Sequence, residues 1–139
     1  MKRKIYFKKE LDVNRQKAFD VVSKFDEYSE FLPGCTGSSL IKRDFPTEIG
    51  RLECNILGKE YFIISENTIS EDSITINQIE GPFNYFEGKW TVEAKSDDSC
   101  IIYFEGELEL PFLLNAMASQ TLIDKFSSAV IEAFINRVS

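Results

Sequence analysis

Histidine is absent from this 139-residue chain, which also has one tryptophan, three cysteines and four prolines. Without imidazole, the chain lacks the side chain that most often serves as a general acid or base near neutral pH and as a zinc ligand. Cys35, Cys54 and Cys100 are widely spaced and form no CxxC pair. We therefore expect no metal site, and we expect reduced, partly buried thiols instead of disulfides.

Basic residues and long apolar runs are also scarce. The chain has 16 Lys and Arg residues against 23 Asp and Glu residues, a net charge of −7. This balance disfavours a nucleic-acid surface, because such a surface needs clustered cations, and we expect no DNA partner. No run approaches the roughly 18 to 20 apolar residues of a membrane span. The lysine-rich start is not followed by the apolar core of a signal peptide. The sequence predicts a cytoplasmic protein, at most peripheral to the inner membrane.

Aromatic residues, in contrast, are abundant: the chain has 12 phenylalanines and five tyrosines, and 43% of its residues are hydrophobic. A chain of this length is expected to form one domain, residues 1–139, around one core. So much aromatic surface either fills that core or lines a pocket, and the composition leaves both open.

Strict alternation of apolar and polar residues predicts an antiparallel sheet with one solvated face. It is clearest in Lys2–Leu11, Phe86–Ala94 and Ile102–Leu110. Further strands are expected over Ser38–Arg43, Ile49–Leu57, Glu60–Ile69 and Ser73–Ile79, with turns at Gly58-Lys59, Glu71-Asp72 and Ser96–Ser99. Gly88 and Gly106 lie in the middle of inward faces, which predicts a curved sheet.

Helical spacing predicts three helices. A short one follows the cap signal at Asp12–Asn14, and a second, Asp26–Leu32, ends at Pro33. The last 28 residues read as one helix, roughly 35 to 40 Å long. Its expected apolar stripe is Leu114, Ala118, Leu122, Phe126, Ala129 and Ala133, widened by Val130, Phe134 and Val138. The predicted fold class is α+β: a curved antiparallel sheet of about seven strands wrapped on a long C-terminal helix.

Three segments carry a family resemblance: YSEFLPGCTGSSLI (Tyr28–Ile41), GPFNYFEGKW (Gly81–Trp90) and VIEAFINR (Val130–Arg137). In this order they resemble the coenzyme Q-binding protein and RatA-like branch of the START-related, polyketide cyclase/dehydrase-like helix-grip superfamily. The resemblance extends from Ile5 to Arg137. It implies a START-like lipid-binding domain, with one apolar cavity between the curved sheet and the C-terminal helix.

The resemblance also implies a ligand. It implies binding and chaperoning of ubiquinone or another isoprenoid quinone in support of respiratory electron transport, without a further cofactor. By that likeness Pro33 and Trp90 lie near the quinone. Tyr28, Tyr61 and the Trp90 indole are candidate polar anchors, because each has a hydrogen-bonding group on an apolar body. The predicted ligand-binding residues are Phe31, Leu32, Pro33, Phe83, Trp90, Phe104, Leu122 and Phe126.

The same resemblance implies an alternative function. The protein would be a RatA-like toxin that binds the large ribosomal subunit and blocks subunit association. Lys2, Lys4 and Lys8 share the polar face of the first strand and are the candidate surface patch. The same lysines would suit anionic lipid headgroups during transient membrane contact, or protect an edge strand from pairing. Distant relatives cyclise polyketides, but no catalytic residue is assigned and we do not expect an enzyme.

Overall fold

The computed structural model describes residues 2–56 and 58–139 and shows a curved sheet with helices on one side. The elements are β1 (Lys2–Leu11), α1 (Arg15–Ser23), the 3-10 helix η1 (Phe25–Glu30), β2 (Cys35–Asp44), β3 (Thr47–Ile56), β4 (Lys59–Ile69), β5 (Ser73–Glu80), β6 (Tyr85–Ser96), β7 (Ser99–Glu109), α2 (Phe112–Met117) and α3 (Gln120–Val138). This order confirms the predicted α+β fold class.

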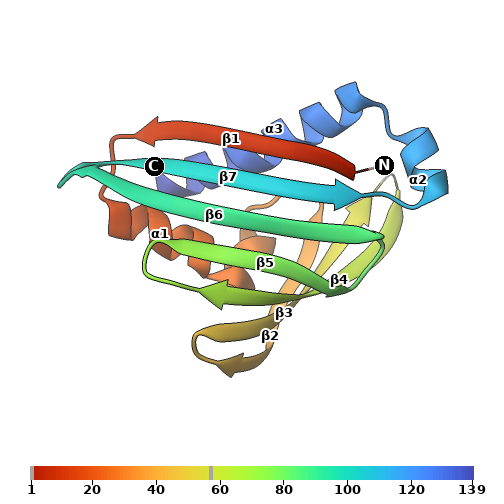
Figure 1. Cartoon of the computed structure of the whole chain (residues 1–139), viewed down its shortest axis with the longest axis horizontal. Coiled ribbons are helices and arrows are strands. Elements are labelled where there is room, and N and C mark those ends of the chain that lie inside the picture. Colours follow the sequence, from red (N-terminus) through yellow and green to blue (C-terminus); the bar gives the residue numbers. More distant parts are fainter. Residues whose placement is uncertain (1, 57) are drawn as a thin grey trace.

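The seven strands form one antiparallel sheet in the order β1-β7-β6-β5-β4-β3-β2. In Figure 1, β1, β7, β6 and β5 run side by side, whereas β4, β3 and β2 turn away from them and give the sheet its curvature. Helix α3 crosses behind β1 and β7, and α2 lies near the start of β1. The sheet and α3 therefore face each other across an interior space, as in a helix-grip fold.

Every predicted strand is present, with boundaries that differ by up to three residues. The predicted end of the third strand at Leu57 lies outside the described residues. Gly58, at the start of the next hairpin arm, has a φ of +82°, a conformation that favours glycine and suits the predicted turn. Asn14 caps α1, as predicted, by accepting a hydrogen bond from the Gln16 N–H at 2.8 Å.

The glycines on the concave face make room for aromatic rings. Gly88 and Gly106 stand opposite each other on β6 and β7. A methyl group on Gly88 would lie 2.9 Å from the Phe104 ring, and one on Gly106 would lie 3.3 Å from it. On β3, a methyl group on Gly50 would lie 2.3 Å from the ring of buried Phe25. These glycines thus admit rings against the backbone as well as allowing the sheet to bend.

The C-terminal segment is two helices, so the prediction of one long helix is wrong. Ala118 has an extended backbone, and the Ser119 hydroxyl caps α3 by accepting a hydrogen bond from the Leu122 N–H at 3.1 Å. At 19 residues, α3 is about 28 Å long. The predicted stripe is also partly wrong, because Ala129 is exposed. The fully covered face of α3 carries Ile131, Phe134 and Val138.

Replacing Gly50 by Ala tests whether the packing of the Phe25 ring requires a glycine at this position of β3. The added methyl must displace the Phe25 ring, so we expect the free energy of unfolding to fall by about 1–3 kcal/mol. Urea unfolding measures the change, and Gly37→Ala on β2 is the control, because its methyl would meet only the exposed Glu53 side chain at 3.3 Å. Equal stability of the two variants would contradict the ring-contact explanation.

Candidate functional site

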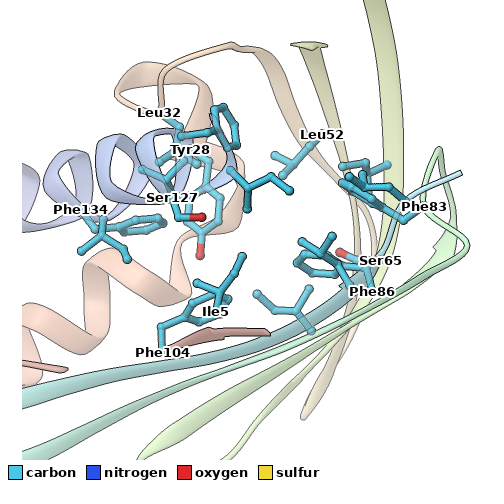
Figure 2. A pocket seen from close by; sticks show the side chains of 18 of the residues that line it. Ile5, Tyr28, Leu32, Leu52, Ser65, Phe83, Phe86, Phe104, Ser127 and Phe134 are labelled. Carbon is cyan, nitrogen blue, oxygen red and sulfur yellow. The ribbon is translucent and has the colours of Figure 1, made fainter. Parts of the chain in front are cut away.

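An apolar cavity of about 350 Å³ lies between the concave face of the sheet and the elements η1, α2 and α3. Its volume is at the lower end of the roughly 300–1,000 Å³ typical of small-molecule sites. Figure 2 shows Ser127, Tyr28, Leu32 and Phe134 on the helical side, facing Phe104 and Phe86 from the sheet. This is the space that the helix-grip resemblance predicts, and the aromatic side chains leave it open.

The Phe134 ring of α3 closes the inner end of the cavity. Its centroid lies 4.7 Å from that of Trp90 and 5.2 Å from those of Tyr28 and Phe31. Trp90 in turn stacks on Phe104 with centroids 4.8 Å apart. Aromatic pairs prefer such offset-stacked and edge-to-face arrangements over a face-to-face sandwich. The cluster joins α3, η1 and β6 into a fixed wall.

Arg137 fastens the last turn of α3 to the same region. Its guanidinium donates hydrogen bonds to Glu27 at 3.2 Å and to Glu30 at 2.7 Å, and it lies 5.1 Å from the centre of the Phe31 ring. The hydrogen bonds raise the pKa of Arg137, the Glu30 bond most. The ending of the VIEAFINR segment therefore meets the segment that contains FLPGC.

Phe83 and Phe86 form the opposite wall, where their rings stack with centroids 5.5 Å apart. The Gln78 amide holds the Gly81–Asn84 loop by donating to the Phe83 carbonyl at 2.8 Å and accepting from the Phe83 N–H at 3.3 Å. The hydrogen bonds of Gln78 thus account for the conformation of the GPF motif. The motif forms a loop, and Gln78 holds that loop so that the Phe83 ring lines the cavity.

The mouth of the cavity lies at the elbow between α2 and α3. Leu122 and Phe126 line the cavity and are also 39% and 52% exposed, so they stand at its opening. Arg3, at the start of β1, holds the elbow: its guanidinium donates to the Asn115 side-chain oxygen at 2.6 Å and to the Ala118 carbonyl at 3.0 Å. A single side chain therefore fixes the position of this rim.

Most polar groups of the lining already have partners. The Tyr28 hydroxyl donates to the Val22 carbonyl, and burial, with a further effect of Glu48, raises the pKa of Tyr28 well above its usual value. The Ser65 hydroxyl donates to Asn67 at 3.0 Å. Neither group is available to a ligand without losing a buried hydrogen bond.

Ser127 is different. In the described part of the chain its hydroxyl has no hydrogen-bond partner, and Figure 2 shows its oxygen directed into the cavity. The lining otherwise consists almost entirely of aliphatic and aromatic side chains. The cavity therefore suits a molecule that is largely apolar and has one hydrogen-bonding group near the middle of α3.

The structure brings six of the eight predicted ligand-binding residues to the cavity. The residues on its lining are Leu32, Phe83, Trp90, Phe104, Leu122 and Phe126. Phe31 and Pro33 do not line it: the Phe31 ring packs behind Phe134 and beneath Arg137, and Pro33 is exposed in a turn. Tyr61 does not line it either. Whether any of these residues binds a ligand stays a prediction.

Sequence reasoning missed Ile123, Ser127 and Ile131 of α3, whereas Val130 and Phe134 belong to the predicted apolar face of this helix. Ile123, Ser127, Val130 and Ile131 all line the cavity. Their spacing of four, three and one residues is itself helical and continues to Phe134, so the signal was present. The predicted stripe also lines the cavity, at Leu114, Ala118, Leu122, Phe126, Val130 and Phe134.

In the predicted basic patch, Lys2 and Lys4 lie opposite glutamates of the neighbouring strand, whereas Lys8 lies opposite Tyr103. In the β1–β7 register Lys2 pairs with Glu109 and Lys4 with Glu107. The Lys2 ammonium also lies 3.9 Å from a Glu107 oxygen. The face is mixed in charge near Lys2 and Lys4, because Glu105, Glu107 and Glu109 occupy alternate positions at the end of β7. It is not the uniformly basic surface that the sequence of β1 suggested.

Among the described residues, few reactive or ionisable side chains lie at the site. None of the cavity-lining residues has a carboxylate, amine or thiol. Within the same part of the chain, no group of three or more His, Cys, Asp or Glu side chains is arranged to hold a metal ion. No helix among these residues is both long enough and apolar enough to cross a membrane.

Residues 11–135 match the family described as polyketide cyclase / dehydrase and lipid transport. Among curated proteins, the ribosome association toxin RatA of Escherichia coli K12 is 25% identical over 123 residues, 88% of this chain and 78% of that protein. The persistence and stress-resistance toxin PasT of Escherichia coli O6:H1 matches with the same identity and coverage. RatA of Vibrio cholerae is 23% identical over 88% of this chain and 85% of that protein.

Solved structures with low sequence identity share the fold. A protein from Thermus thermophilus superposes with a TM-score of 0.84 at 15% identity, covering 98% of this chain and 97% of that one. A START superfamily protein from Mycobacterium smegmatis gives 0.82 at 19% identity, covering 97% and 96%. The Zhui aromatase/cyclase from Streptomyces sp. R1128 gives 0.78 at 14% identity, covering 99% and 92%. These matches confirm the fold.

Replacing Arg3 by Met tests whether this residue fixes the cavity mouth. Loss of its hydrogen bonds to Asn115 and Ala118 should speed deuterium exchange in residues 112–119 by about ten- to a hundredfold, because bonds to a charged donor contribute about 1.5–3 kcal/mol. Exchange in β6 and β7 should not change. Lys4→Met on the opposite face of β1 is the control, and a similar effect there would contradict the assignment.

Proposed function

The chain belongs to the polyketide cyclase / dehydrase and lipid transport family, and we propose that it binds and chaperones one hydrophobic molecule, an isoprenoid quinone such as ubiquinone. The observation that carries the proposal is the apolar cavity, with the single uncommitted hydroxyl of Ser127. Delivery of the quinone to respiratory electron transport would be its role, with transient contact at a membrane surface where the ligand is exchanged.

The walls of the cavity fit the parts of such a ligand. The aromatic rings of Trp90, Phe104 and Phe134 provide flat apolar surface for a quinone ring. The Ser127 hydroxyl can donate to a quinone carbonyl. A cavity of about 350 Å³ holds a substituted ring and a short length of tail, so a longer isoprenoid tail would leave through the mouth at Leu122 and Phe126. Contact with that apolar rim would keep part of the tail from water.

Binding without catalysis suits the lining residues. The ionisable group on the cavity is the Tyr28 hydroxyl, which is committed to Val22 and whose pKa is raised by burial. General acid–base catalysis needs a group that titrates near the working pH. We therefore propose a carrier and assign no catalytic residue.

Filling the cavity tests the proposal. Ser127→Phe places a ring where Figure 2 shows the serine oxygen, and we expect affinity for a short-tailed ubiquinone to fall at least tenfold while the Tm stays the same or rises. Quenching of Trp90, the only tryptophan, measures binding. Ser128→Phe on the exposed side of α3 is the matched control and should bind normally.

Unchanged binding in a folded Ser127→Phe protein would place the ligand elsewhere. If that variant does not fold, Ser127→Leu makes the same test with a smaller side chain. Mass spectrometry of an organic extract of the protein, purified from a quinone-producing host, identifies what it carries. A stoichiometric lipid other than a quinone would keep the cavity and reject the respiratory role.

Ribosome association is the second candidate, and the curated relatives favour it, since those named above include ribosome association toxins of two genera. The candidate surface is the exposed face of β1, with Lys4 and Lys8 among the glutamates of β7. Such a mixed surface is weaker than the basic patch that RNA contacts favour. The two candidates are compatible with one chain, because this face and the cavity lie on opposite sides of the sheet.

Reversing both charges, Lys4→Glu with Lys8→Glu, tests the second candidate. We expect the double variant to lose cosedimentation with ribosomes at low salt, because like charges would then crowd against Glu105 and Glu107 and repel RNA. Quinone binding should be unchanged, since both side chains point away from the cavity. Persistent cosedimentation would remove this face from the interaction.

A further inference from the structure

Cys35 and Cys54 stand directly opposite each other at the start of β2 and near the end of β3. The Asn55 N–H donates to the Gly34 carbonyl at 2.8 Å, so the backbone hydrogen bond lies one residue outside the cysteine pair. This pattern defines a non-hydrogen-bonded pair, in which the two side chains share a face and the Cα atoms lie about 4.5 Å apart. A disulfide accepts Cα separations of about 4.4–6.8 Å.

The two thiols are also free and accessible. Both side chains are half-buried, whereas Cys100 is fully buried. The strand neighbours of Cys100 are Leu11 on β1 and Ala94 on β6, so it has no cysteine opposite it. The Cys35 thiol makes one weak hydrogen bond, a donation to the Gly37 carbonyl at 3.4 Å. Rotation of this side chain toward Cys54 therefore loses little.

We propose that Cys35 and Cys54 are a modification site, at which a small-molecule disulfide such as oxidised glutathione forms a reversible intramolecular disulfide. One protein thiolate attacks a sulfur of the small disulfide, forms a mixed disulfide and releases one small thiolate. The second protein thiolate attacks the mixed disulfide and releases the other. The protein loses two electrons and two protons, and the small disulfide is reduced to two thiols. The proposal does not depend on the identity of any cavity ligand.

The site adjoins the cavity. Leu32 lies three residues before Cys35, Asn55 follows Cys54, and both line the cavity. A disulfide between the cysteines would tie the turn at Pro33-Gly34 to the end of β3, next to these two residues. We expect oxidation to raise the Tm by several degrees, because it reduces the number of conformations open to the unfolded chain, and to slow deuterium exchange in the segment before β2.

The rate of oxidation should depend on pH. Burial, followed by the charges of Cys35 and Glu60, raises the pKa of Cys54 to about 11. Burial also raises the pKa of Cys35; the hydrogen bond to Gly37 lowers it and the charge of Glu53 raises it. Arg51 is paired with Glu53 at 3.6 Å and partly offsets its charge. Below these pKa values the thiolate fraction grows tenfold with each pH unit. Oxidation should therefore quicken by up to about tenfold per unit between pH 7 and pH 9.

The experiment uses the full chain incubated with oxidised glutathione at pH 8, then alkylated under denaturing conditions and weighed by mass spectrometry. We expect monomeric protein with one alkylated thiol, Cys100, and a peptide that joins Cys35 to Cys54. Cys100→Ser should form the same bridge at the same rate. Cys35→Ser and Cys54→Ser should each retain glutathione on the remaining partner, and a thiol reductant should restore the free pair.

Three results would overturn the proposal. One is recovery of three alkylated thiols after prolonged incubation at pH 9. Another is stable glutathione on both Cys35 and Cys54 in the unmutated chain, which would show that the thiols cannot reach each other. The third is a bridge that includes Cys100 or a second copy of the chain. If a serine variant does not fold, Cys35→Ala and Cys54→Ala make the same comparison.

Discussion

The contact of the Phe134 ring with Tyr28, Phe31 and Trp90 is the constraint on which the rest of the structure depends. It joins the C-terminal helix, the 3-10 helix and the centre of the sheet at one buried point. With this end fixed, α3 diverges from the sheet toward α2, and the cavity lies between α3 and the sheet. The rings meet at tilted and edge geometries, and aromatic pairs of this kind contribute about 0.5–1.5 kcal/mol beyond their buried area.

The cavity combines a closed aromatic end with an open apolar mouth, and that asymmetry gives a bound molecule a direction. Buried polar groups at the closed end are satisfied inside the protein, so they neither attract water nor compete for it. The hydroxyl of Ser127 is the exception. A cavity of this kind selects by shape and apolar contact, with one hydrogen bond to orient the ligand.

Particular elements show how far sequence reasoning reached. The alternation in β6 and β7 predicted both strands, their inward faces and the solvated glutamates. It also placed Trp90 and Phe104 on the lining. The break at Ala118-Ser119 was missed because serine is tolerated within a helix and caps one only when its own backbone is extended, as that of Ser119 is. Phe31 and Pro33 do not line the cavity, because a turn after η1 decides which way each side chain points.

By itself the sequence determined the class of fold, the order of elements and the apolar faces, because strand and helix periods are local properties of the chain. It also excluded histidine chemistry outright. Only the tertiary structure decided the rotation of α3, the neutralisation of Lys2 and Lys4 by β7, and the pairing of Cys35 with Cys54. Those features depend on strand register and helix packing, which join residues far apart in the chain and have no signature in any one segment.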